Sequence, residues 1–177
     1  MSILSVKNLN KLKNIRLLIL DVDGVLTDGS IIYNDDGLET KMFNVRDGLG
    51  IRLLIKAGIQ VCIVTGRSSK ALFYRCENLK IKYMFDGIGD KAAICDNICD
   101  QAGVNASEIA FVGDDLPDLS LMKKVGFAIA VAGAHELVIK SADMVTTAQG
   151  GSGAVREACE EILKAKGLWE EILKNYL

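Results

Sequence analysis

Short apolar runs rich in β-branched residues alternate along this 177-residue chain with longer stretches in which apolar residues recur at helical spacing. The apolar runs predict six strands, at residues 17–22, 60–64, 83–85, 109–112, 127–130 and 143–146. Nearly all are apolar at every position, as is typical of parallel strands covered by helices on both faces. The stretches between and after them predict helices at 48–57, 68–79, 91–103, 116–125 and 155–166. This alternation indicates an α/β fold.

Residues 30–44 depart from that alternation. The segments SIIYN and LETKMFN flank the sequence NDDG at 34–37, which is typical of a turn between two antiparallel strands. We therefore expect a small β-hairpin arm at about residues 30–44. The pattern contains no linker, repeat or second hydrophobic core. We expect one domain over residues 1–177, a three-layer Rossmann-like sandwich with a mainly parallel sheet and no cap domain.

Composition narrows the class of protein. Half of the residues are apolar, enough for one sizeable core, and the net charge of -2 gives no basic field for a nucleic-acid partner. No apolar run reaches signal-peptide length at the start or the roughly 18 residues of a membrane helix, so we expect a cytoplasmic protein without a membrane partner. The five cysteines form no C-x-x-C pair and the only histidine is His135. We expect reduced core thiols and no zinc site.

Reactive side chains follow the first two main strands. The first apolar run stops at Asp21, and Asp23 lies two residues further on. Two neighbouring carboxylates repel each other unless a cation lies between them, and Mg²⁺ is a hard cation that prefers oxygen ligands. The second strand ends in Thr65 and Gly66, a hydroxyl and a flexible backbone suited to a phosphate oxygen, and Arg67 follows.

Further charges follow two later strands. Asp114, Asp115 and Asp118 come directly after the strand at 109–112, and Lys91 begins the predicted helix that follows residues 83–85. Taken singly, each is an ordinary turn, cap or surface residue. The carboxyl ends of parallel strands share one edge of the sheet, however, so these groups should meet there. Together they predict a site for magnesium and a phosphoryl group.

The segments DVDGVLTDG, IVTGR, DK and GDDLPD, in this order, resemble the four motifs of the haloacid dehalogenase superfamily of phosphatases. The resemblance implies that Asp21 is the nucleophile and that Asp23 is the general acid and base, with its backbone carbonyl on the metal. It further implies that Thr65 and Lys91 bind the phosphoryl group and that Asp114 is a Mg²⁺ ligand. Asp118 would orient Lys91 or a metal-bound water; the same is open to Asp115, and the sequence does not separate the two.

Segments outside those motifs carry a narrower resemblance. KMFNVRDGLGIRLL, TGRSSKALFYRCENL and GGSGAVREACEEIL are similar to the 3-deoxy-D-manno-octulosonate 8-phosphate (KDO 8-phosphate) phosphatase family. This implies Mg²⁺-dependent hydrolysis to KDO and phosphate through an aspartyl-phosphate, in lipopolysaccharide precursor synthesis. The substrate carries a carboxylate away from its phosphate, which a guanidinium would bind. Arg67 and Arg75 are the candidates, because we expect them near one face of a single helix.

Two alternative functions remain. A related subgroup hydrolyses 9-phosphates of nine-carbon sialic-type acids, but it often has Glu where this chain has Arg67, which favours the eight-carbon substrate. Ser152 stands where a basic or amide residue is frequent, which puts one substrate contact in doubt. The other alternative is a non-catalytic assembly domain of the same fold. The presence of Asp21 and Asp114 argues against that alternative.

The arm also leads to an expected quaternary structure. Ile32 and Met42 lie among alternating residues of the hairpin, and the chain offers no second domain to cover them. An isolated two-stranded hairpin is marginally stable and has unpaired edges. Pairing of arms from several subunits would bury its apolar face, and the family resemblance implies a homotetramer built in this way. A neighbouring subunit would then serve as the lid, with the glycine-rich segment 150–153 flexible enough to help close the site.

Overall fold

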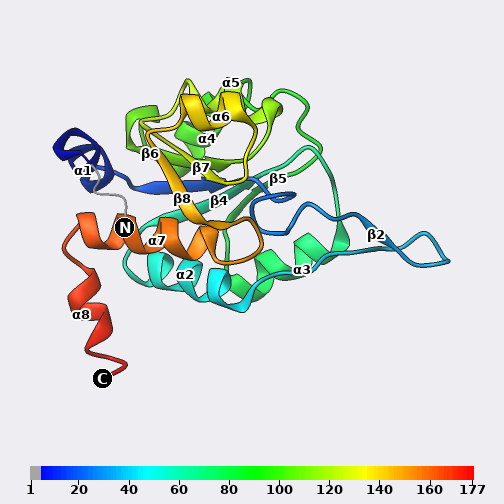
Figure 1. Ribbon diagram of the computed structural model, residues 1–177, viewed down its shortest axis with the longest axis horizontal. Coiled ribbons are helices and arrows are strands. Elements are labelled where there is room, and N and C mark those ends of the chain that lie inside the picture. Colours follow the sequence, from blue (N-terminus) through cyan, green and yellow to red (C-terminus); the bar gives the residue numbers. More distant parts are fainter. Residues whose placement is uncertain (1–4) are drawn as a thin grey trace.

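The computed structural model describes residues 5–177 and is built on a six-stranded sheet (Figure 1). Its strands lie in the order β5-β4-β1-β6-β7-β8, and every neighbouring pair is parallel. The central strand β1 spans Leu17–Leu20 and lies between β4 and β6. The bounds of the others are Gln60–Val64 (β4), Tyr83–Phe85 (β5), Ile109–Gly113 (β6), Phe127–Ala132 (β7) and Met144–Gln149 (β8).

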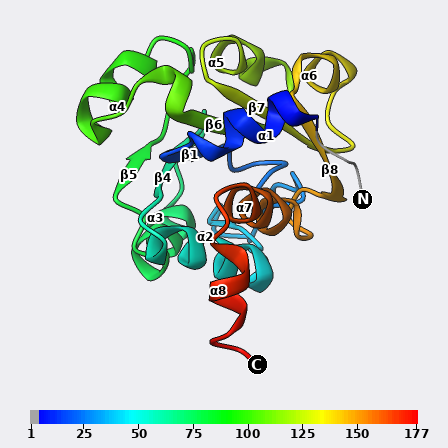
Figure 2. The same ribbon diagram turned by 90° about the vertical axis from the view of Figure 1, so that its left-hand side faces the viewer.

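Helices cover both faces of the sheet, which gives three layers (Figure 2). On one side lie α2 (Val45–Lys56), α3 (Lys70–Leu79) and α7 (Ala154–Ala165), with α1 (Val6–Lys13) packed against α7. On the other side lie α4 (Cys95–Ala102), α5 (Leu119–Met122) and α6 (Glu136–Ser141), and α8 (Trp169–Leu173) follows α7. Successive side chains of a strand point to opposite faces of the sheet. In β1, Leu18 and Leu20 therefore pack in the hydrophobic cluster on the side of α2, α3 and α7, and Leu17 and Ile19 pack in the cluster on the side of α4, α5 and α6.

The predicted α/β three-layer sandwich is confirmed, and all six predicted strands exist with small shifts at their ends. The helices agree less closely. The stretch predicted at 91–103 becomes helical only at Cys95, and the one at 116–125 divides into a 3₁₀ turn, η2 (Leu116–Asp118), and the short α5. Asp115 explains the latter, because its carboxylate accepts the backbone N–H of Leu116 and so caps a tight turn. Helices α1, α6 and α8 were not predicted.

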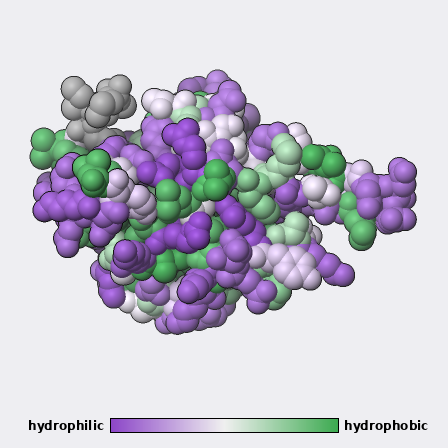
Figure 3. All heavy atoms as spheres, turned by 90° about the horizontal axis from the view of Figure 1, so that it is seen from below, coloured by the Kyte–Doolittle hydropathy of each residue, from purple (hydrophilic) through white to green (hydrophobic). Residues whose placement is uncertain are grey.

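The arm is antiparallel, as expected, but its paired part is short. Its strands are β2 (Ile32–Tyr33) and β3 (Glu39–Thr40). The Asn34 side chain closes the turn by accepting the backbone N–H groups of Asp36 and Leu38. The arm extends away from the body in Figure 1, and in Figure 3 hydrophobic atoms lie along it behind a hydrophilic tip. The large apolar side chains it exposes are Ile31, Ile32, Tyr33, Leu38 and Met42.

Two further sequence expectations concern the whole chain. All five cysteines lie within the described residues and are free thiols; four of them are buried. None of the helices in residues 5–177 combines the length and the apolar character that a bilayer crossing requires.

Candidate active site

The functional groups predicted from sequence gather at the carboxyl edge of the sheet, in a pocket of about 460 Å³. This edge is where ligands bind in open α/β sheets, at the point where the chain order reverses on either side of β1. Loops that follow four different strands contribute to it. The predicted site residues that line this pocket are Asp21, Asp23, Thr65, Gly66, Arg67, Lys91, Asp114, Asp115 and Asp118.

The loop after β1 brings the first carboxylate to the floor of the pocket. Asp21 directly follows the strand, is 8% exposed, and its backbone N–H donates to the carbonyl of Val112 on β6. The chain then turns through Gly24, whose φ is +87°. A Cβ on Gly24 would lie 2.0 Å from a carboxylate oxygen of Asp114. Only glycine allows both the left-handed backbone and this close approach.

Asp118 joins the loops that follow β5 and β6. One of its oxygens, Oδ1, accepts a hydrogen bond from Lys91 Nζ at 2.6 Å, and Oδ2 accepts the backbone N–H groups of Asp114 at 2.8 Å and Asp115 at 3.3 Å. Lys91 Nζ also lies 2.8 Å from Asp21 Oδ1. Asp118 and Lys91 are almost completely buried, whereas Asp115 is exposed. The structure therefore separates the two aspartates that the sequence left equivalent: only Asp118 holds Lys91.

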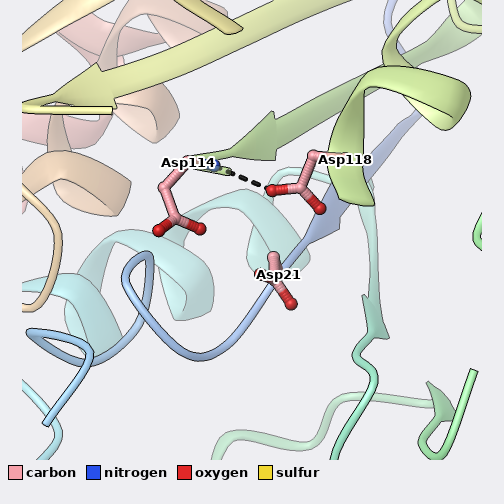
Figure 4. A group of neighbouring side chains, drawn as sticks. All are labelled: Asp21, Asp114 and Asp118. Carbon is pink, nitrogen blue, oxygen red and sulfur yellow. Dashed lines mark hydrogen bonds between the residues drawn. The ribbon is translucent and has the colours of Figure 1, made fainter. Parts of the chain in front are cut away.

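Three carboxylates lie close together at this edge (Figure 4). Asp21, Asp114 and Asp118 each have an oxygen within 4.8 Å of the others. Burial, followed by the charge of Asp118, raises the pKa of Asp21 to about 6, against the opposing effect of Lys91. Burial, followed by the charge of Asp21, raises the pKa of Asp114 to about 7. The ammonium group of Lys91 does not offset the desolvation and mutual repulsion of these carboxylates, so both pKa values stay raised.

The donor set fits a magnesium ion. Its members are carboxylate oxygens, which Mg²⁺ prefers, and the buried Oδ1 of Asp114 has no hydrogen-bond partner among the described residues. Asp21 and Asp114 would hold the ion, together with the backbone carbonyl of Asp23, as the sequence resemblance implies. Both oxygens of Asp118 are already engaged by protein donors.

The loop after β4 lies beside the loop of Asp21, because β4 is the neighbour of β1 in the sheet. Thr65 is buried, its backbone N–H donates to Phe85 on β5, and its hydroxyl accepts the backbone N–H of Arg67 at 3.4 Å. Gly66 carries no side chain, and a Cβ there would lie 3.7 Å from the carbonyl oxygen of Ile88. The Thr65 hydroxyl and the Gly66 backbone thus line the same pocket as Asp21 and Asp114.

The two candidate arginines do not share a helix. Helix α3 begins at Lys70, so Arg67 precedes it and the expectation of a common helical face is wrong. Ser68 and Ser69 lie outside the helix, and the backbone of Ser69 is extended. Arg67 lines the pocket. Arg75 instead donates to the carbonyl of Asn44, lies over the ring of Phe43 and is not among the residues that line this pocket.

Sequence reasoning missed two charged residues of the arm that reach the site. Lys41 donates a hydrogen bond to Asp23 and lies 2.8 Å from Glu39, and Glu39 accepts a hydrogen bond of 2.6 Å from Arg67. Burial disfavours the Lys41 ammonium, but its bonds to Asp23 and Glu39 outweigh this and raise the pKa of Lys41. The alternation of SIIYN and LETKMFN predicted the hairpin without indicating which side chains turn back toward the sheet.

The glycine-rich segment at 150–153 is a packed support for the loop after β1. The backbone N–H of Gly151 donates to Val25, and a Cβ on Gly150 would lie 1.7 Å from the carbonyl oxygen of Gly24. The buried carboxylate of Asp47 holds the end of the segment by accepting the N–H groups of Gly153 and Arg156. These contacts contradict the expectation of a loop free to close over the site.

Fold and site together define a hydrolase of the haloacid dehalogenase type, and a family model described as haloacid dehalogenase-like hydrolase matches residues 86–157. The chain is 47% identical over 161 residues to the KDO 8-phosphate phosphatase KdsC of Escherichia coli K12, covering 91% of this chain and 86% of that protein. The chain belongs to the KDO 8-phosphate phosphatase family.

Solved structures agree with this assignment. The crystal structure of the KDO 8-phosphate phosphatase of Moraxella catarrhalis, in complex with a magnesium ion, a phosphate ion and KDO, has a TM-score of 0.94 at 42% identity and covers 97% of this chain and 98% of that one. The structure of the Yersinia pestis phosphatase has a TM-score of 0.91 at 44% identity, with coverage of 93% and 89%.

Proposed function

We propose that this protein is a magnesium-dependent phosphatase that hydrolyses KDO 8-phosphate to KDO and phosphate through an aspartyl-phosphate on Asp21. The observation that carries the proposal is the group formed by Asp21, Asp118 and Lys91, which are buried, and Asp114, which is half-buried, at the end of the central strands. The family relationship supports the substrate, because the relatives at 47% identity bear the name of KDO 8-phosphate phosphatase and the Moraxella enzyme binds magnesium, phosphate and KDO.

Each residue has a defined task in this reaction. The Asp21 carboxylate attacks phosphorus, and Lys91, 2.8 Å from it, balances charge on the phosphoryl oxygens together with the Thr65 hydroxyl. Bound magnesium supplies the remaining positive charge between the carboxylates and the phosphate. Asp23 gives a proton to the leaving oxygen and then takes one from the water that cleaves the aspartyl-phosphate. Asp118 fixes Lys91.

The remainder of the substrate is recognised by the loop after β4. Arg67 lies at the mouth of the pocket, where its guanidinium can bind a carboxylate in a bidentate fashion. In the chain alone Glu39 takes that place, because it accepts a hydrogen bond of 2.6 Å from Arg67. The carboxylate of the sugar acid would therefore displace Glu39 from Arg67 or bind to Arg67 beside it.

Phosphate release from a panel of phosphorylated sugar acids tests the function. KDO 8-phosphate should be hydrolysed with a kcat/KM well above that for a nine-carbon sialic-type 9-phosphate, and activity should vanish with a chelator and return with Mg²⁺. Asp21→Asn serves as the matched inactive control, since the amide is nearly isosteric. Preference for the nine-carbon substrate would transfer the assignment to the sialic-type subgroup. No turnover of either with Mg²⁺ present would favour the assembly domain.

We also propose that residues 1–177 form a single domain and that the protein is a homotetramer assembled through the arm. One sheet separates the two buried clusters, and five large apolar side chains are exposed on the arm. Light scattering should give about 76 kDa, four times the chain mass of 19.1 kDa. Ile32→Asp combined with Met42→Asp should give smaller species. A fully active 19 kDa parent would overturn the tetramer.

A further inference from the structure

Lys41 has an unusual environment for a residue of the arm. It directly follows β3, and the neighbouring Leu38 and Met42 are 61% and 63% exposed. The Lys41 side chain, in contrast, is 2% exposed. Its ammonium group ends between two carboxylates, those of Asp23 in the pocket and Glu39 on the arm itself. The arm therefore exposes its hydrophobic side chains and turns the charged side chains of Lys41 and Glu39 inward.

This arrangement is costly unless it has a specific use. A lysine is among the residues least often buried, and removing its charge from water costs several kcal/mol that a paired carboxylate offsets only in good geometry. If position 41 served only to pack the arm against the body, an apolar residue would do so without this cost. The buried ion pair gives little net stability, but it fixes the position of its partners.

Asp23 depends on this contact for its orientation. Among residues 5–177, Lys41 donates the only hydrogen bond that the Asp23 side chain accepts, and Arg67 lies further away, at 3.7 Å. Asp23 follows β1 on a loop and is not held by the sheet, unlike Asp21, whose backbone N–H bonds to β6. Without Lys41, the Asp23 carboxyl would be free to take other rotamers.

We propose that Lys41 is a positioning residue for the Asp23 carboxyl in proton transfer to the leaving group. Glu39 forms ion pairs with both Lys41 and Arg67. A continuous series of ion pairs therefore links the base of the arm to the pocket. The inference rests on the proposed phosphatase reaction and deepens it. It makes the orientation of the general acid depend on the arm.

Leaving-group dependence tests this role. Phenyl phosphate and p-nitrophenyl phosphate have nearly the same shape, but nitrophenolate departs without a proton far more readily than phenolate does. The value of kcat/KM reports transfer of the phosphoryl group to Asp21, before water enters. Lys41→Met should therefore reduce kcat/KM for phenyl phosphate about tenfold or more beyond its effect on p-nitrophenyl phosphate, since general acid catalysis contributes about 10²- to 10⁴-fold.

Two more variants keep the test specific. Lys41→Arg, which retains the charge, should restore part of the phenyl phosphate activity. In an Asp23→Asn background, Lys41→Met should change kcat/KM for phenyl phosphate by less than about twofold, because two residues that act as one unit are not additive. Lys11→Met is the matched control, because Lys11 forms an ion pair with Asp143 far from the pocket. It should leave both substrates unaffected.

Each alternative gives a different result. Equal losses on both aryl phosphates would mean a structural role and would overturn the proposal, as would full additivity with Asp23→Asn. A loss confined to KDO 8-phosphate would make Lys41 a sugar contact and would overturn it also. Near-UV circular dichroism and light scattering of each variant check folding and assembly. The proposed function is tested separately, by the turnover of KDO 8-phosphate by the parent enzyme. A failure of the Lys41 proposal would therefore leave the proposed function standing.

Discussion

Replacing Lys91 by Met should strongly destabilise the magnesium-free protein at neutral and higher pH. The change removes the one ammonium that bonds to both Asp21, at 2.8 Å, and Asp118, at 2.6 Å, and leaves a side chain of similar length. Burial disfavours the ammonium, but these two carboxylates outweigh it and raise the pKa of Lys91. This contribution is fully present below the unfolded pKa of about 10.5 and is lost as pH rises through the higher folded pKa, so Lys91 stabilises the fold over the whole working pH range.

The size of the effect follows from the burial of the partners. Breaking a buried ion pair by removing one member costs about 3 to 5 kcal/mol, because the other charge stays buried and unpaired. The pKa values of Asp21 and Asp114, about 6 and about 7, lie above the unfolded value of 3.8. Between pH 3.8 and about 6 to 7, the folded state binds more protons than the unfolded state. The free energy of unfolding without metal therefore falls as pH rises through this window. Lys91→Met should steepen that fall.

Urea unfolding at pH 5.5 and pH 8, with and without Mg²⁺, measures this directly. We expect the parent to lose stability from pH 5.5 to pH 8 without metal, the variant to lose more, and Mg²⁺ to restore more at pH 8. Lys140→Met is the control, because its pair with Glu136 is exposed and should contribute about 0.3 to 0.5 kcal/mol. If Lys91→Met has the same free energy of unfolding as the parent at pH 8 without metal, the ion pairs of Lys91 do not stabilise the fold as argued above.

Five other substitutions test the site. Asp21→Asn should abolish turnover without unfolding, and activity within tenfold of the parent would remove Asp21 from its role. Asp114→Asn should raise the Mg²⁺ concentration needed for half-maximal activity, and excess Mg²⁺ should restore part of the rate; no change in that concentration would mean that Asp114 is not a ligand. Arg67→Ala should reduce kcat/KM for KDO 8-phosphate about ten- to a hundredfold and spare p-nitrophenyl phosphate, whereas Arg75→Ala should do less; equal losses on both substrates would count against carboxylate recognition. Gly150→Ala should cost about 2 kcal/mol or more in urea unfolding, because the new methyl group meets the backbone of Gly24, and an unaffected midpoint would contradict the packing.

The sheet could be predicted because its strands are buried on both faces. The residues of β1, β4 and β6 are apolar at nearly every position, a pattern that suits few other structures. The helices that escaped prediction lack such a pattern. Helix α1 buries only Leu12 and α6 only Val138, and α8 buries none of its residues, so no apolar face of useful length exists in their sequences.

The placement of the site residues followed from topology alone. Once the strands are parallel, the residues after them must meet at one edge, which brought Asp21, Thr65 and Asp114 together without knowledge of any side chain. The errors concern residues whose position depends on an irregular backbone. Arg67 lies outside α3 because the chain stays non-helical until Lys70, and Lys41 turns inward along a path that hydrophobic alternation does not specify.

The contact of Gly150 with Gly24 has a consequence for natural variation and for protein engineering. Two backbones touch there with no room for a side chain, so neither position can drift while the other stays in place. Gly151 is equally confined, against the backbone of Thr27 and Asp28. Ser152, between these fixed residues and Gly153, is exposed. It is therefore the position in this segment where a new side chain can be introduced without disturbing the loop of Asp21.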